Sequence, residues 1–318
     1  MHKIVITGGA GFIGSHVTEK LYASYPESEI VIFDKMTYAA DYENVAHMFE
    51  RHRVRLVVGD VCDLAACRDI LKDCDLLVHL AAESHVDNSF GDSLSFTRTN
   101  TLGTHALIEA ARVAEVPKII HISTDEVYGE MVTGEADENA RLIPTNPYSA
   151  SKAAADMIVT SYVKSFALPV VIVRSNNIFG IRQYPEKLIP RCCLSLIRGE
   201  KIPIHGNGAH TRHFLAAEDF ANAIDLLISK GKIGEVYNIG THDEYTNLEV
   251  VSMICTEFGV APDDVIEFVA DRPFNDQRYN ITTDKLAKLG WKPTRFLKDE
   301  VGKLRAWYEE NVYRYKNF

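Results

Sequence analysis

The sequence has no apolar run approaching the roughly 18 residues that a membrane-spanning helix needs, which argues against an integral membrane protein. It also lacks, after Met1, the basic segment, apolar stretch and small-residue cleavage site of a secretory signal. We therefore expect a cytoplasmic protein without a membrane partner.

Positive charge is in deficit, because 34 Lys and Arg residues face 44 Asp and Glu residues, for a net charge of −10. Surfaces that bind nucleic acid or anionic membranes need clustered Lys and Arg, so neither partner is expected. The six cysteines show no C-x-x-C spacing and no histidines in a zinc pattern. We predict free thiols rather than disulfides, and no metal site.

What the chain does contain is ample apolar material, since 46% of its 318 residues are hydrophobic and 25% are charged. Up to about residue 174, short β-branched runs alternate with helical stretches, which is typical of a doubly wound α/β fold with a buried parallel sheet. The predicted strands are KIVIT, EIVIF, VRLVV, LLVHLA, KIIHIS and VVIV, and the predicted helices include 12–25, 94–114 and 148–166.

After about residue 178 the segments are punctuated by proline and glycine, which indicates a smaller, mixed substrate lobe. Helices are predicted there near 187–198, 216–230, 247–259 and 299–311. The strand-like run VYNIG at 236–240 is expected to rejoin the sheet. We therefore expect a dinucleotide-binding Rossmann domain of residues 1–177 with 213–240, and a second domain of residues 178–212 and 241–318.

A glycine-rich turn joins the first predicted strand to the first helix in KIVITGGAGFIGSHV, with Gly8, Gly11 and Gly14 in G-x-x-G-x-x-G spacing. Glycines let the backbone approach a ligand closely, and the helix N-terminus offers free N–H groups and about +0.5 of a charge to a pyrophosphate. Tight turns also use glycine for steric reasons alone, but the position between strand and helix favours dinucleotide binding.

Acidic residues follow the second and third predicted strands. Asp34 can accept hydrogen bonds from both ribose hydroxyls and would repel a 2′-phosphate, so NAD is favoured over NADP, although the neighbouring Lys35 opposes this preference. Asp60 is a candidate for the adenine edge or, equally, for a helix or turn cap.

Two groups of residues are candidates for chemistry. Tyr148 and Lys152 lie four apart at the start of a predicted helix, where the ammonium favours the phenolate and Tyr148 could deprotonate a hydroxyl during hydride transfer. An ordinary amphipathic pair is the alternative. Thr124, Asp125 and Glu126 follow the fifth strand at the carboxyl edge of the sheet, as hydrogen-bond partner, general acid and general base, with helix capping as the alternative.

On these segments the chain resembles the extended short-chain dehydrogenase/reductases and, within that group, the nucleoside-diphosphate-glucose 4,6-dehydratases. The matching segments are TGGAGFIGSH, DKMTYAA, AAESHVDNSF, STDEVYG, NPYSASKAAAD, PEKLIP, RPFNDQRY and LGWKP. The Asp-Glu pair in TDEVYG is the specific part, because epimerases and decarboxylases of the group share the glycine loop and Tyr-x-x-x-Lys but usually lack this pair.

The resemblance implies an NAD-dependent hydro-lyase that oxidises a sugar at C4, expels water across C5 and C6, and returns the hydride to C6, giving a 4-keto-6-deoxy sugar. It implies a homodimer through the helices at 94–114 and 148–166. It implies NAD contacts from Gly8, Gly11, Phe12, Ile13, Gly14, Asp34, Lys35, Thr37, Asp60, Val61, Leu80, Ala81, Ala82, Ser84, Thr99, Tyr148 and Lys152. The implied nucleotide-sugar contacts, within the second lobe and beside it, are Ser84, Thr124, Asn177, Lys187, Leu188, Pro203, His205, Arg212, Asn247, Arg272 and Asn275.

Several positions depart from the bacterial dTDP-glucose pattern. Ile178, His205 and the pair Phe274-Asn275 look more like the UDP-glucose 4,6-dehydratase module of plant rhamnose synthases, whereas AAES looks bacterial. The nucleotide base therefore stays open between dTDP and UDP. A same-fold epimerase or decarboxylase is the first alternative function, and a noncatalytic NAD-binding sensor is the second.

Overall fold

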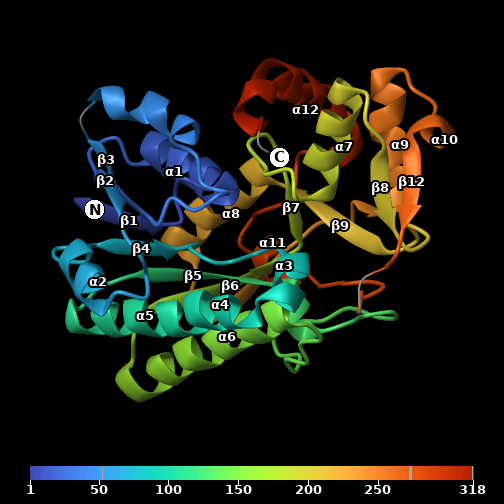
Figure 1. Cartoon of the computed structure of the whole chain (residues 1–318). Coiled ribbons are helices and arrows are strands. Elements are labelled where there is room, and N and C mark those ends of the chain that lie inside the picture. The colour runs from blue at the N-terminus through green and yellow to red at the C-terminus, as the bar shows by residue number, and fades with distance from the viewer. Residues whose placement is uncertain (52, 272–273, 317) are drawn as a thin grey trace.

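The computed structural model describes residues 1–51, 53–271, 274–316 and 318 (Figure 1). Within these residues lies a seven-stranded parallel sheet of order β10-β6-β5-β4-β1-β2-β3. The strands are β1 (Lys3–Thr7), β2 (Glu29–Asp34), β3 (Val54–Val58), β4 (Leu76–His79), β5 (Ile119–Thr124), β6 (Val170–Ser175) and β10 (Val236–Ile239). The predicted doubly wound α/β fold is confirmed.

Helices cover both faces of this sheet, as Figure 1 shows. Alternate residues of a strand point to opposite faces, so Ile4 and Ile6 pack in the core under α1 (Phe12–Ser24) and α8 (Ala217–Lys230), while Val5 packs in the core on the other face. That second face is covered by α2 (Leu64–Ile70), α5 (Thr104–Val113) and α6 (Pro147–Phe166). Because both faces are buried, the strands are almost uniformly apolar.

The stretch predicted as one helix over 94–114 has three parts, which are α4 (Ser93–Phe96), the π-helical segment η3 (Thr97–Gly103) and α5. Asn100 in the π segment donates from Nδ2 to the carbonyl of Glu83 at 2.9 Å and to Oγ of Ser151 at 2.9 Å. At Gly103, an added Cβ would lie 2.7 Å from a methyl of Val61. The π segment thus brings Asn100 onto the loop after β4 and places the backbone of Gly103 against Val61 in the turn after β3.

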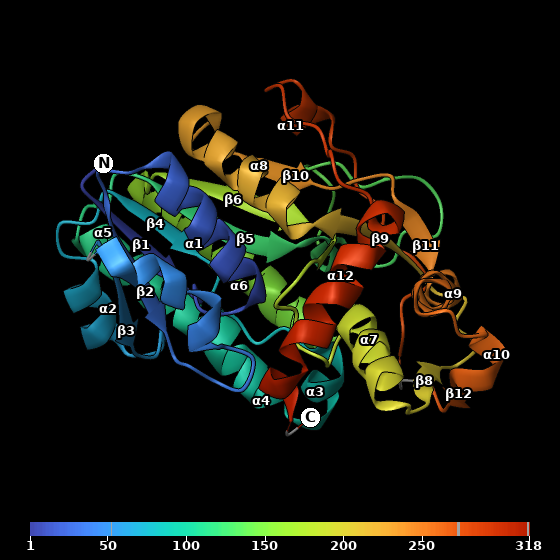
Figure 2. The same cartoon turned by 90° about the horizontal axis from the view of Figure 1, so that it is seen from above.

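The second lobe has a mixed three-stranded sheet, β11-β9-β7, and a parallel pair, β12-β8. Its strands are β7 (Asn177–Phe179), β8 (Ile202–His205), β9 (Thr211–Ala216), β11 (Glu244–Thr246) and β12 (Ile266–Val269). Helices α7 (Leu188–Arg198), α9 (Asn247–Phe258) and α12 (Leu297–Asn311) enclose a separate apolar core beside them. Figure 2 shows α12 in red between the sheet domain and α7.

The remaining elements are short. They are η1 (Tyr42–Asn44), η2 (Ala46–Arg51), α3 (Val86–Gly91), η4 (Asp125–Tyr128), α10 (Pro262–Val265), α11 (Asp284–Ala287) and η5 (Val312–Tyr315). In the described part of the chain, no helix combines the length and apolarity needed to cross a membrane.

Candidate active site

The Asp-Glu pair is held in a tight turn at the carboxyl end of β5. The hydroxyl of Thr124 caps η4 by accepting from the backbone N–H of Glu126 at 3.3 Å. The turn ends at Gly129, whose φ of 81° favours glycine and where an added Cβ would lie 2.2 Å from the carbonyl oxygen of Ile143. Thr124 is thus a capping residue, and the turn that it caps presents the two acids.

Asp125 is buried, with an exposed fraction of 2%. Asn176 donates to Oδ2 of Asp125 at 2.8 Å, and the hydroxyl of Thr124 donates to Oδ1 at 3.3 Å. Burial raises the pKa of Asp125 to about 7, and repulsion from Glu126 adds to the shift. The neighbouring acids do repel each other, as expected, but loss of hydration is the larger cause.

Glu126 is partly buried and has a more polar environment. Asn146 and Tyr279 each donate to Oε2 of Glu126 at 3.4 Å. Burial raises the pKa of Glu126, while the positive charges of Arg212 and Lys187 act in the opposite direction. Both carboxyl groups accept from an asparagine amide and lie near Arg212, and they differ in that Lys187 adds a second opposing charge at Glu126.

Tyr148 and Lys152 lie one turn apart at the start of α6. Asn146 caps this helix in a capping box with Ser149, and Pro147 occupies its first turn. Lys152 is buried, and its ammonium donates to the carbonyl of Ile122 at 2.7 Å. The pair is thus part of a buried cluster at the carboxyl end of β5 rather than a pair on a helix surface.

The electrostatics of this pair differ from the sequence-based expectation. Burial lowers the pKa of Lys152 to about 8, with the carboxylate of Asp156 opposing the shift. Burial also raises the pKa of Tyr148, Glu126 raises it further, and a hydrogen bond with Thr124 lowers it. Desolvation of the phenolate therefore dominates the pKa of Tyr148, and Lys152 is not among the groups that lower it.

All of the residues predicted to contact NAD line one cavity of about 290 Å³, which runs from the glycine loop to Tyr148 and Lys152. The cavity suits a dinucleotide because the glycine loop leaves no room for side chains. A Cβ added to Gly8 would lie 2.8 Å from the backbone of Ala81. A Cβ added to Gly14 would lie 2.0 Å from the carbonyl oxygen of Gly8. The N-terminus of α1 opens into this cradle, as pyrophosphate binding requires.

The acidic residues of this cavity also support the loop. Oδ2 of Asp34 accepts from the backbone N–H of Ala10 at 3.0 Å. Oδ1 of Asp60 accepts from the N–H of Cys62 at 2.9 Å, and Oδ2 pairs with Lys35 at 2.9 Å. Asp60 thus caps a turn and also lines the cavity, and Lys35 is held by Asp60.

A second cavity of about 590 Å³ lies between the sheet domain and the second lobe. Predicted nucleotide-sugar contacts that line it are Asn177, Lys187, Leu188, Pro203, His205, Arg212, Asn247 and Asn275. Ser84 and Thr124 line the first cavity instead, and Arg272 lies outside the described residues. Glu126, Asn177 and Lys187 line both cavities, so the two spaces meet beside the Asp-Glu pair.

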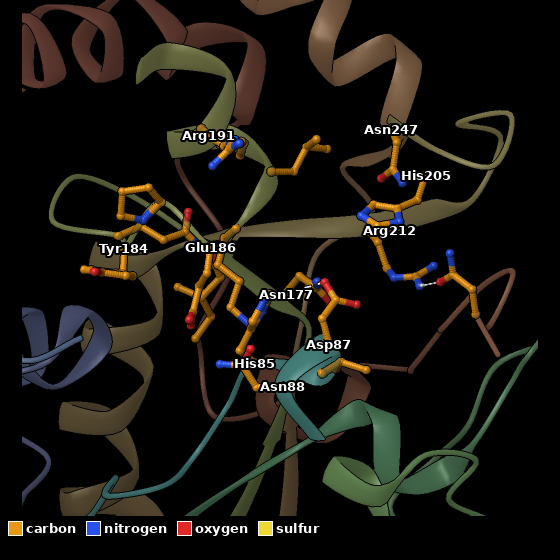
Figure 3. Close-up of a pocket in the computed structure, with 18 of the residues that line it drawn as sticks. His85, Asp87, Asn88, Asn177, Tyr184, Glu186, Arg191, His205, Arg212 and Asn247 are labelled. Atoms are coloured by element: carbon orange, nitrogen blue, oxygen red, sulfur yellow. Dashed lines mark hydrogen bonds and ion pairs between the residues drawn. The ribbon is translucent and has the colours of Figure 1, made fainter. Parts of the chain in front are cut away.

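The second cavity contains three cationic side chains, Lys187, Arg191 and Arg212, together with four acidic ones, Asp87, Glu126, Glu186 and Asp276. Figure 3 shows Arg191 and Asn247 projecting from one side, His85 and Asn88 from the other, and Arg212 near His205. Arg212 donates to Oδ1 of Asn275 at 3.3 Å. Among the described residues, the buried Nε of Arg191 finds no hydrogen-bond partner. A diphosphate would satisfy such a donor.

Sequence reasoning missed several residues that line this cavity, namely Tyr38, His85, Asp87, Asn88, Tyr184, Glu186, Arg191, Asp276 and Tyr279. His85, Asp87 and Asn88 lie in AAESHVDNSF, and Asp276 and Tyr279 in RPFNDQRY. Both segments were already part of the resemblance, and this was the available signal. Arg191 carried no such signal, because its neighbours in α7 form an ordinary amphipathic pattern.

Residues 5–303 match the family model described as GDP-mannose 4,6 dehydratase. The chain belongs to this family. It is 40% identical to the dTDP-D-glucose 4,6-dehydratase of Homo sapiens over 99% of this chain and 92% of that protein. The predicted kinship with nucleoside-diphosphate-glucose 4,6-dehydratases is confirmed.

A second relative is the trifunctional UDP-glucose 4,6-dehydratase/UDP-4-keto-6-deoxy-D-glucose 3,5-epimerase/UDP-4-keto-L-rhamnose-reductase of Arabidopsis thaliana, at 45% identity over 97% of this chain. The chain spans about half of that protein's length, namely 47%. Among solved structures of family members, the dTDP-glucose 4,6-dehydratase DesIV of Streptomyces venezuelae, with NAD bound, matches with a TM-score of 0.95 at 37% identity, over 99% of both chains.

Proposed function

We propose that this chain is an NAD-dependent 4,6-dehydratase that converts UDP-glucose or dTDP-glucose to the 4-keto-6-deoxy sugar nucleotide. The observation that carries the proposal is the meeting of two residue pairs where the two cavities join. Tyr148 and Lys152 line the first cavity, and Glu126 lines both, with Asp125 buried beside it. An oxidation pair beside an elimination pair is the arrangement that a dehydratase needs.

The reaction follows from what each side chain can do. The C6 hydroxyl is a poor leaving group and the C5 proton is not acidic, so direct elimination would be slow. NAD bound in the first cavity would accept a hydride from C4 and return it to C6. The positive charges of a bound nicotinamide ring and of Lys152 would favour the phenolate of Tyr148 against the effect of burial, and this phenolate would take the C4 hydroxyl proton. The C4 ketone acidifies C5, Glu126 removes the C5 proton, and Asp125 protonates the leaving C6 oxygen, which departs as water. As the hydride returns to C6, Glu126 gives a proton back to C5. Release of the C4 hydroxyl proton from Tyr148 to solvent and uptake of one by Asp125 restore the starting state.

Substrate binding is assigned to the second cavity. Lys187, Arg191 and Arg212 are the positive groups suited to the diphosphate. We propose that residues 1–177 with 213–240 form the NAD-binding domain, and that 178–212 with 241–318 bind the nucleotide sugar. The relatives leave the base open, because one named for UDP-glucose and one named for dTDP-glucose are similarly identical to this chain.

Two further features belong to the proposal. The apolar side chains exposed on α4 and α6, including Leu94 and Met157, support a homodimer through these helices. The six cysteines are free thiols, which supports a reducing, cytoplasmic setting.

The test follows the hydride. The substrates are dTDP-, UDP-, CDP- and GDP-glucose with deuterium at C4 of the glucose. Each is incubated with the protein, and the product methyl group is analysed by mass spectrometry. We expect the deuterium in the C6 methyl group, and in heavy water we expect solvent deuterium at C5. Tyr148→Phe should lose both events, whereas Glu126→Gln should lose C5 exchange but keep C4 oxidation.

Each other outcome points elsewhere. Deuterium lost to solvent would contradict internal hydride return. An unchanged C6 hydroxyl with inversion at C4 would identify an epimerase. NAD binding with no turnover of any of the four sugar nucleotides would favour the noncatalytic sensor.

A further inference from the structure

The glycine loop is supported from outside the first cavity by the turn that follows β2. The carbonyl oxygen of Ala10, in the middle of the loop, accepts from Nδ2 of Asn44 at 2.9 Å and from the backbone N–H of Asp41 at 3.1 Å. Asn44 is buried, with an exposed fraction of 2%. Since the N–H of Ala10 donates to Asp34, both polar groups of this peptide position are engaged. The loop is therefore held from two directions.

A residue of the second lobe holds this turn in place. Arg314 lies in η5, directly after α12, and its side chain is only 6% exposed. Its Nη2 donates to Oδ1 of Asn44 at 2.5 Å and to Oδ2 of Asp41 at 2.6 Å, and its Nε donates to the same Asp41 oxygen at 2.9 Å. The guanidinium also lies over the ring of Trp307, 5.3 Å from its centroid. The guanidinium of Arg314 thus binds Asn44 and Asp41, the two residues that donate hydrogen bonds to the carbonyl oxygen of Ala10.

We propose that Arg314 is a positioning residue for the cofactor, holding the glycine loop in its dinucleotide-binding shape through Asn44 and Asp41. The inference rests on the proposed binding of NAD. A buried guanidinium must keep its partners, and its rigid fork fixes them in one geometry. The amide of Asn44 is oriented by Arg314 at one end and so presents its Nδ2 to Ala10 at the other. The second lobe thereby stabilises the cradle for the pyrophosphate.

The matched control is the neighbouring residue. Tyr313 also joins η5 to the same turn, donating from its hydroxyl to Oε2 of Glu43 at 2.8 Å. Glu43 is exposed, and none of the contacts described for its side chain reaches Ala10. The same Oε2 also lies 3.7 Å from Nε of Arg314, so Tyr313→Phe removes an inter-lobe hydrogen bond at the same place while the hydrogen bonds from Arg314 to Asn44 and Asp41 stay in position.

The experiment measures NAD dissociation and loop protection rather than turnover. For Arg314→Gln we expect the dissociation constant for NAD to rise about tenfold, as the loss of a buried charged hydrogen-bond pair implies. Amide exchange in residues 8–14 should become faster, while exchange in β5 stays unchanged. Tyr313→Phe should behave like the wild type in both measurements. With NAD saturating, the KM for the sugar nucleotide should be unchanged in Arg314→Gln.

A double-mutant cycle tests the route. If Arg314 acts through Asn44, adding Arg314→Gln to Asn44→Ala should weaken NAD binding by much less than Arg314→Gln does alone. Should Arg314→Gln fail to fold, Asn44→Ala replaces it, because it removes the contact with Ala10 and keeps the Arg314–Asp41 pair. The inference would be overturned if Arg314→Gln, or Asn44→Ala in its place, bound NAD with wild-type affinity. An equal loss of NAD affinity in Tyr313→Phe would also overturn it. Absence of NAD binding by the wild type would instead overturn the proposed function.

Discussion

At the scale of single residues, two adjacent carboxyl groups differ because their surroundings differ. Asp125 is buried beside the amide of Asn176, and its pKa rises to about 7. Arg212 opposes the rise in the pKa of both groups, and Lys187 opposes it at Glu126 as well. A carboxyl that holds its proton near neutral pH suits a general acid, and one with cations nearby suits a general base.

This difference predicts the pH dependence of water loss. Asp125 donates a proton only in its acid form, which predominates below its pKa of about 7. As the pH rises through this value the acid form disappears, so the single-turnover rate of water loss should fall about tenfold per pH unit above it. Asp125→Asn should lose about 100-fold in this rate and show no such limb. A descending limb that persists in Asp125→Asn would assign the acid to another group.

At the scale of elements, one helix start serves both stability and the site. Asn146 caps α6 by accepting from the N–H of Ser149 at 2.9 Å, and its Nδ2 donates to Glu126. Asp63 caps α2 in the same domain, accepting from the N–H of Ala65 at 2.9 Å, without any contact to the acids among its described hydrogen bonds. The two caps are therefore a natural pair for comparison.

Asn146→Ala should lower the free energy of unfolding by about 1 kcal/mol and also reduce kcat, because Glu126 loses a hydrogen bond. Asp63→Ala should cost about as much stability and leave kcat at the wild-type value. Urea titration with initial-rate kinetics on both variants measures the two effects. Equal kcat in the two variants would mean that Asn146 acts on the helix alone.

At the scale of the whole molecule, α4 and α6 expose apolar side chains that no described element covers. Leu94 is 79% exposed, and Met157 is 67% exposed. Large apolar side chains that are exposed on neighbouring helices are typical of interfaces. Phe268, on β12, is also 60% exposed but lies on the other lobe.

The proposed homodimer predicts a selective effect of charge on this surface. Leu94→Glu and Met157→Glu should each shift the protein from dimer to monomer at micromolar concentration, because a buried unpaired carboxylate opposes association. Phe268→Glu should stay dimeric. Light scattering after size-exclusion chromatography measures the mass of each variant, and a monomeric wild type would exclude the dimer outright.

Local patterns in the sequence were enough to predict the sheet and the glycine loop, and to single out the residues that are proposed to carry the chemistry. Strand runs with both faces buried are mostly apolar, and Tyr148 and Lys152 show the four-residue spacing of one helix face. Thr124, Asp125 and Glu126 are adjacent in the chain, so no folding was needed to see them as a group. These features depend on neighbours within a few residues.

Only the tertiary structure decided the features that depend on distant neighbours and on burial. The π segment at 97–103 forms where Asn100 meets the backbone of Glu83, which helical periodicity does not encode. The raised pKa of Tyr148 comes from loss of solvent around a folded site. Arg314 reaches Asn44 across 270 residues of chain, and no local pattern marks such a pair. Short-range spacing sets which elements form, whereas packing sets the dielectric and the long-range contacts that position the site.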